Sequence, residues 1–227
     1  SSLLKLGKTN FNGSVLLKAC TNGSSELMTN LSSSLVNSLY NLQLMKYAGE
    51  NGVAAYGAIM YVNFIFISIF LGYSVGSAPI VSYHYGAGNR DELKNMFKKS
   101  TCLIAIWGIL LVVLAHIIAG PLTKIFVGYD AELYVLTRHG FLIYSFTYLI
   151  NGCNIYASSF FTALNNGLIS ALISFLRTLV FKLAAVMLLP LIFGLDGIWG
   201  AIIVAEAITL CMTLFFVFSQ RKNYGYL

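Results

Sequence analysis

The sequence predicts an all-α membrane protein, a bundle of six transmembrane helices. Apolar residues make up 58% of the 227 residues and charged residues only 10%, whereas a soluble domain is typically about 25% charged. The mean hydropathy is +0.78, so the chain has too little charge to cover a globular surface in water. Because one span needs roughly 20 apolar residues, a chain of this length has room for about six helices joined by short loops.

Polar turns and charged helix ends divide the chain into predicted segments. Residues 1–25 are rich in Gly, Asn, Ser and Lys, and we expect a cytoplasmic connecting loop with a short amphipathic helix on the membrane surface. The transmembrane lobe is predicted at 26–220 and a cytoplasmic tail at 221–227. The six spans within the lobe are predicted at 26–47, 53–83, 97–119, 133–161, 168–193 and 198–218.

The first predicted span is unusually polar for a membrane helix. Its polar residues recur at steps of three and four, which places them on one face: Glu26, Asn30, Ser33, Asn37 and Asn41. Hydrocarbon would leave these groups unpaired, so the face must meet protein or water. We interpret the carboxylate and the asparagines as a cavity wall, and Ser33 as a packing contact between helices. An alternative for Glu26 is an interfacial charge that caps the helix start.

Polar residues are fewer in the second and fourth spans. Asn63 is the strongly polar residue inside the second span, and Pro79 near its exit makes that helix easy to kink. Tyr148 and Asn151 lie on the fourth span, where we expect Gly152 to permit a bend. We predict that Asn63, Tyr148 and Asn151 complete the cavity wall.

Charged residues lie inside the last two spans. Arg177 and Lys182 are flanked by apolar residues in the fifth span, so we expect them to face the bundle or to extend toward the interface. Glu206 lies in the interior of the sixth span. It is either a second carboxylate of the cavity or a partner of Arg177 or Lys182 within the lobe, and we favour the second interpretation.

Lys and Arg are divided unevenly between the two sides of the predicted membrane. If the loop after the second span is cytoplasmic, that side has Lys5, Lys8, Lys18, Arg90, Lys94, Lys98, Lys99, Arg221 and Lys222, and the other has Lys46, Lys124 and Arg138. Basic residues collect on the cytoplasmic side of membrane proteins. Both ends of the chain are therefore predicted to be cytoplasmic, and the net charge of +6 does not require a nucleic-acid partner.

Motifs for catalysis, metal binding and cofactor binding are missing from the sequence. The four cysteines form no CxxC pair, and His84 has no second ligand at metal spacing. The YGAG run at 85–88 follows no strand and matches no phosphate-binding loop. No nucleophile–base pair is recognisable. We expect no cofactor and no enzymatic activity.

Three stretches together resemble the MATE (multidrug and toxic compound extrusion) family. They are GSSE at 23–26, GYSVGSAPIVSYHYGAGN at 72–89, and Arg177 followed by LLPLIFGLDGIWGA at 188–201. The resemblance covers nearly the whole chain and corresponds to spans seven to twelve of such a protein. The chain also starts at Ser1 without Met. We therefore expect a fragment whose partner, the N-terminal six-helix lobe, is missing.

The resemblance implies a cation-coupled antiporter of the plasma (inner) membrane of a bacterium. Such a protein exports organic cations and drugs by alternating access while protons or sodium ions enter, so its partners are the lipid bilayer, the cations and the missing lobe. A carboxylate early in the seventh helix can join a cation site in this family, and Glu26 matches it. The helix-ten carboxylate of some members has no counterpart here.

A related alternative is a flippase for lipid-linked oligosaccharides from the same broader superfamily. Such a cavity is expected to present several Arg or Lys to a pyrophosphate. In this sequence only Arg177 and Lys182 could serve.

Overall fold

The computed structural model describes residues 12–226 and, among them, every side chain except Asn22, Ser24, Ser25, Glu26, Met28 and Thr29. All regular structure in residues 12–226 is helical, as the sequence predicts. The elements are α1 (Gly13–Gly86), α2 (Arg90–Val127), α3 (Ala131–Ser145), α4 (Tyr148–Ala163), α5 (Gly167–Phe175), the π-helix η1 (Leu176–Phe181) and α6 (Lys182–Tyr224).

Two glycines bend the longest helices. Gly49, with φ 59° and ψ −151°, divides α1 into arms of residues 13–48 and 50–86. Gly194, with φ 57° and ψ −133°, divides α6 into arms of residues 182–193 and 195–224. Glycine adopts such angles without the steric cost of a Cβ. Since α3 and α4 form one rod, and α5, η1 and the first arm of α6 another, residues 12–226 form six rods.

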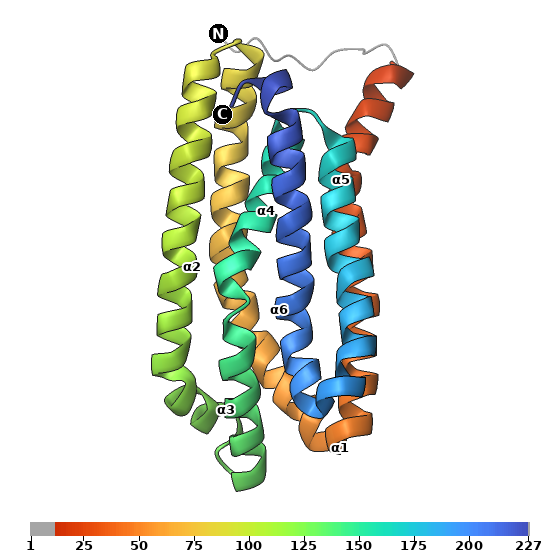
Figure 1. The fold of residues 1–227 in the computed structure, drawn as a ribbon, viewed down its shortest axis with the longest axis vertical. Helices are drawn as coiled ribbons and strands as arrows, with labels where there is room; N and C mark the ends of the chain where they lie inside the picture. Colours follow the sequence, from red (N-terminus) through yellow and green to blue (C-terminus); the bar gives the residue numbers. More distant parts are fainter. Residues whose placement is uncertain (1–11, 227) are drawn as a thin grey trace, which may run out of the picture.

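The rods run side by side along the long axis of the molecule (Figure 1). The helix α2 lies at one edge, and the first arm of α1 lies at the other, beside α5 and the first arm of α6. Gln43 Nε2 donates to Met187 Sδ at 3.3 Å and fixes the register of these two neighbours. The start of α1 and the end of α6 lie at the same end of the bundle.

The outer surface of the bundle is apolar. Large side chains that the described part of the chain leaves exposed include Phe64, Ile65, Ile109, Ile117 and Phe215. Three helical stretches are long and apolar enough to cross a membrane, namely Asn30–Gly86, Arg90–Val127 and Gly167–Tyr224. The chain is therefore a multi-pass membrane protein, with lipid as the solvent for these side chains.

Several helices extend beyond the predicted spans. The helix α1 already begins at Gly13, capped by Asn12, whose side chain accepts from Val15 N at 3.3 Å. A short helix was predicted in this segment, but no loop separates it from the first predicted span, because a single Gly23 costs a helix only about 1 kcal/mol. The helix α2 similarly continues through Pro121 to its end at Val127.

The fourth rod is interrupted between α3 and α4, not at Gly152. Phe146 and Thr147 donate backbone hydrogen bonds to carbonyls three residues earlier, which tightens this turn. The bend predicted at Gly152 is wrong, since that residue lies in the regular helix α4. A Cβ at Gly152 would lie 2.6 Å from the Phe70 ring and 2.7 Å from Ile104. The glycine therefore serves close packing of three helices.

Candidate functional site

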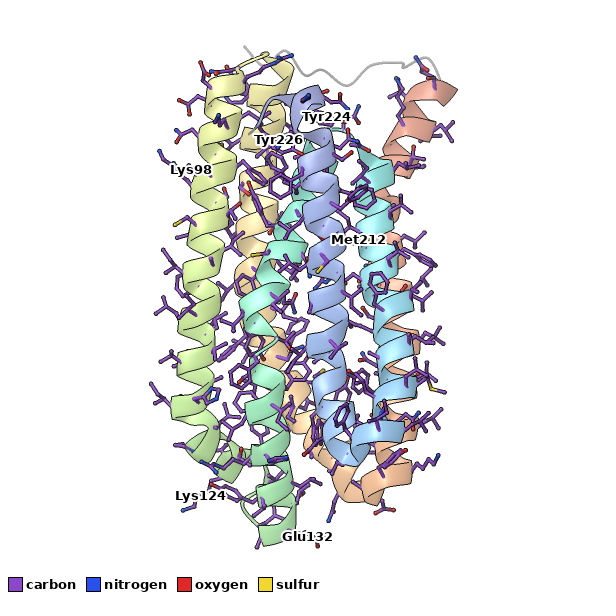
Figure 2. The ribbon with its side chains drawn as sticks, viewed as in Figure 1. Lys98, Lys124, Glu132, Met212, Tyr224 and Tyr226 are labelled. Atoms are coloured by element: carbon purple, nitrogen blue, oxygen red, sulfur yellow. The ribbon has the colours of Figure 1, made fainter. Side chains whose placement is uncertain are left out.

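Glu206 is a fully buried carboxylate inside the second arm of α6. It is 0% exposed and stands 12 residues after the bend at Gly194, about 18 Å along the axis at 1.5 Å per residue. This depth lies within a hydrocarbon core of about 30 Å. Figure 2 shows the two ends of the bundle between which it lies, with Tyr224 and Tyr226 at one end and Lys124 and Glu132 at the other.

Two cations from the neighbouring rod reach Glu206. Arg177 Nε lies 3.0 Å from both carboxylate oxygens, so it donates to the pair. Lys182 Nζ lies 3.5 Å from Oε1. The structure therefore confirms the favoured interpretation of Glu206 as a partner of Arg177 and Lys182. A carboxylate held by two donors of opposite charge is the expected state of a buried ion in a low-dielectric interior.

The π-helix η1 explains how both cations reach the same carboxylate. Arg177 and Lys182 are five residues apart, which in an α-helix would place them about 140° apart around the axis. Hydrogen bonds in a π-helix connect residues five apart, and this stacks the two positions on nearly the same face. The extra residue in this turn thus directs both side chains toward α6.

Two asparagines of α4 complete the polar cluster, which we define as Asn151, Asn154, Arg177, Lys182 and Glu206. Asn154 Nδ2 donates to Glu206 Oε2 at 2.8 Å and to the Glu206 backbone oxygen at 3.0 Å. Arg177 Nη2 donates to Asn151 Oδ1. Both asparagines are 0% exposed. Their spacing of three residues on a helix presents both amides to the same neighbour.

Four tyrosines from α1, α3 and α4 belong to the same buried core, and two of them lie near Glu206. They are Tyr40, Tyr56, Tyr144 and Tyr148, all buried. Tyr40 and Tyr56 stack with ring centroids 5.0 Å apart. Tyr40 and Tyr144 lie close enough to Glu206 for their hydroxyls to interact electrostatically with its carboxylate. The surroundings thus consist of aromatic rings that carry polar hydroxyl groups.

Hydrogen-bonding capacity in and near the cluster is not fully used. Among the described residues, the buried atoms without a partner include Asn151 Nδ2, Asn154 Oδ1, Tyr40 Oη and Tyr148 Oη. Buried polar atoms are usually satisfied.

The predicted cavity residues fall into two groups. Asn151 joins the polar cluster and Tyr148 is one of the four tyrosines of the buried core. Asn30, Asn37 and Asn41 are instead exposed on the first arm of α1, where Asn37 Oδ1 accepts from Tyr56 Oη at 3.0 Å. The structure therefore does not bring the asparagine stripe onto the cluster.

Three further predicted residues lie apart from the cluster. Asn63 is buried, and its one recorded contact is Nδ2 to Met60 Sδ at 3.9 Å. Pro79 is exposed within the second arm of α1, where the helical backbone angles continue through it. Glu26 lies in α1, but its side chain is outside the part of the chain that the structure describes.

Asn154, Tyr40, Tyr56 and Tyr144 are functional candidates that the sequence alone did not single out. Asn154 follows Asn151 by one helical step, so this spacing was a usable signal. Tyr40 and Tyr144 had none, because their proximity to Glu206 depends on how separate rods pack.

A second ionic contact lies at the opposite end from the chain termini. His139 Nε2 is 2.7 Å from Asp196 Oδ1, and both side chains are more than half exposed. His139 borders an open hollow of about 610 Å³, which Tyr47 and Glu132 also line. Within the described residues, no group of three His, Cys, Asp or Glu side chains could hold a metal ion.

Comparison with known families identifies this architecture. The family model MatE matches residues 27–188. The chain belongs to the MatE family. The resemblance drawn from the sequence motifs is thereby confirmed. A curated relative, the multidrug export protein MepA of Staphylococcus haemolyticus, is 23% identical over 184 residues, which are 81% of this chain and 40% of the relative.

Solved structures show the same fold for this MatE chain. An outward-facing multidrug resistance MATE family transporter aligns with a TM-score of 0.86 at 17% identity, over 98% of this chain and 50% of that one. A MOP superfamily transporter from Pyrococcus furiosus gives 0.84 at 16% identity, over 95% and 49%. The Vibrio cholerae transporter VcmN in its bent form gives 0.80 at 18%, over 90% and 47%. The chain thus spans about half the length of these relatives.

Proposed function

We propose that this chain is one lobe of a secondary transporter that exports organic cations. The second, N-terminal lobe would face it across a central cavity, and rocking of the two lobes would expose that cavity to each side of the membrane in turn. Membership of the MatE family and similarity to the multidrug export protein MepA support this proposal. The antiport step would use entering protons or sodium ions.

The observation that carries the proposal is the charged cluster at membrane depth. Ionisable side chains inside spans are costly and typically mark a transport path. In this chain Glu206 is 0% exposed, yet it is held by Arg177 and Lys182 and lies near aromatic rings. Aromatic faces suit flat organic cations of varied shape.

The exposed asparagine stripe supports a lobe with a missing partner. Asn30, Asn37 and Asn41 lie on the outer face of the first arm of α1, where lipid would leave their amides unsatisfied. We propose that this face lines the cavity toward the N-terminal lobe, with Glu26 on the same stripe as a candidate coupling carboxylate.

We place the transporter in the inner membrane of a bacterium with both ends of this chain in the cytoplasm. The start of α1 and the end of α6 lie at the same end of the bundle, and basic residues of the described helix ends there include Arg90, Lys94, Arg221 and Lys222. The flippase alternative is favoured by one observation, the presence of two cations in the cluster. Their engagement with Glu206 and Asn151 leaves little of them for a pyrophosphate.

The test uses the full-length protein in liposomes. A proton gradient and then a sodium gradient are imposed, and uptake of the cationic dye ethidium is followed for the wild type and for Glu26→Gln. Gradient-driven dye movement that Glu26→Gln abolishes is the expected result. If dye movement is the same in Glu26→Gln, the antiporter proposal stands, but Glu26 is not a coupling residue. Absence of movement under both gradients contradicts the antiporter and favours the flippase.

A further inference from the structure

The polar cluster contains one cation more than its carboxylate can balance. Arg177 contacts both oxygens of Glu206 at 3.0 Å, whereas Lys182 contacts one oxygen at 3.5 Å. A guanidinium stays charged in proteins, while a lysine can lose its proton. With both cations charged the cluster carries a net charge of +1, and Lys182 holds the weaker contact.

No second negative charge approaches Lys182 from the described residues around it. The arms of α1 contribute Tyr40 and Tyr56, and α3 contributes Tyr144; all are neutral phenols at physiological pH. The helix α4 contributes the neutral Tyr148, Asn151 and Asn154. The sequence of α5 has no ionisable residue. The charged neighbours of Lys182 are Arg177 and Glu206 alone.

Lys182 is also the most exposed side chain of the charged trio in this lobe. Its side chain is 16% exposed, against 10% for Arg177 and 0% for Glu206. An ammonium without its own counter-charge in a low-dielectric interior is strongly unfavourable. Loss of one proton from Nζ makes the cluster neutral and leaves the Arg177–Glu206 pair intact.

We propose that Lys182 is the proton-exchange site of this lobe, and that its proton and an organic cation in the cavity exclude each other. This inference rests on the proposed function. In the step itself, Lys182 Nζ–H⁺ releases its proton to water on the side to which the cavity is open and becomes a neutral amine. No other bond forms or breaks, and the net charge of the cluster falls from +1 to zero.

Mutual exclusion follows from the electrostatics of the two states. A cationic substrate near a cluster of charge +1 is repelled, and the same substrate near a neutral cluster is not. At separations of about 8 Å and an effective dielectric constant of about 20, this difference corresponds to an affinity change on the order of tenfold or more. By linkage, the bound cation shifts the proton equilibrium of Lys182 by the same factor. Binding of the cation therefore favours release of the proton, which is the direction of coupling that proton–cation antiport requires.

The site differs in position from the Glu26 candidate. Gln43 and Met187 lie side by side, and the two rods descend in the same direction in Figure 1. Lys182 precedes Met187 by 5 residues and Glu26 precedes Gln43 by 17. At 1.5 Å per residue, Glu26 lies about 18 Å farther along the axis. Variants of the two residues therefore test separate positions.

The test uses the purified full-length transporter in detergent and tetraphenylphosphonium as the cation. Proton release on binding is followed with a pH indicator in weak buffer, and the affinity is measured as a function of pH. The wild type is expected to release protons and to bind more tightly as pH rises. Lys182→Gln is expected to lose this release and to bind with an affinity that no longer depends on pH. Lys182→Arg, which stays charged, is expected to keep the weak affinity of the protonated wild type at every pH, so that it falls on the order of tenfold below the wild type at high pH.

Lys94→Gln serves as the matched control, because Lys94 is an exposed lysine near the start of α2; it should behave as the wild type. If Lys182→Gln keeps both the proton release and the pH dependence, Lys182 is not the exchange site. The proposed function still stands in that case, because the wild type binds the cation. If Lys182→Gln does not fold, Lys182→Arg decides the question. An affinity of Lys182→Arg that depends on pH as it does in the wild type also rules out Lys182 as the exchange site. Absence of tetraphenylphosphonium binding to the wild type contradicts the proposed function and the exchange site together.

Discussion

Two ionic contacts of this lobe differ in distance and in exposure, and the longer of the two is the more important energetically. His139 and Asp196 are 2.7 Å apart, and their side chains are 54% and 59% exposed. Arg177 and Glu206 are 3.0 Å apart, with side chains 10% and 0% exposed. Both contacts connect a neighbouring rod to the second arm of α6. The longer contact has the larger energetic consequences, because water screens the first pair and cannot screen the second.

The comparison shows what each contact can do. An exposed pair contributes about 0–1 kcal/mol and can be replaced without harm. A buried pair is costly to form, and breaking it strands a charge in the interior. Since an apolar core would hold the rods together equally well, the buried charges of this lobe are better explained by transport than by folding.

The largest effect is expected from Glu206→Ala. This substitution leaves Arg177 and Lys182 as two buried cations without a carboxylate, which costs about 3–5 kcal/mol. Thermal unfolding of the full-length protein in detergent measures the loss. Glu206→Gln is the control for shape, since it keeps an acceptor for Asn154 and removes only the charge. A loss below about 1 kcal/mol for Glu206→Ala would show that the cluster is not buried in the assembled protein.

The smallest effect is expected from His139→Gln at the exposed pair. The expected change in stability is at most about 1 kcal/mol, because the pair is screened by water and both side chains are free to move. The same thermal unfolding assay measures it, ideally across a salt series, since screening should remove any difference. A loss comparable to that of Glu206→Ala would contradict the argument from exposure.

Much of the fold follows from the sequence because the bilayer restricts the choices. In hydrocarbon every backbone group must bond within its own helix, so composition alone predicts a helical bundle. Turn residues near Gly49 and Gly194 then separate the rods. The ends of the helices were harder to predict. Asn22 and Gly23 are helix breakers by local propensity, but α1 continues through them, because propensity differences of about 1 kcal/mol are small beside the cost of an unbonded backbone in lipid.

The charged part of the site was predictable because of the same apolar surroundings. A charged residue in an apolar span is conspicuous, so Arg177, Lys182 and Glu206 could be identified and their pairing anticipated. The π-turn that brings the two cations to one face leaves no signature in an α-helical periodicity. The asparagine stripe was visible as well, but the sequence could not show that these side chains stay exposed and outside the cluster, because that depends on the packing of α1 against α5.

The central claim is that the buried charges serve transport and are dispensable for folding. The direct test is the triple variant Arg177→Met/Lys182→Met/Glu206→Leu in the full-length protein, assayed for thermal stability and for gradient-driven ethidium movement in liposomes. Replacement of a whole buried ionic cluster by apolar residues is often neutral or stabilising. The account predicts wild-type stability, within about 1 kcal/mol, and loss of gradient-driven dye movement. Dye movement at the wild-type rate in a folded triple variant would contradict it.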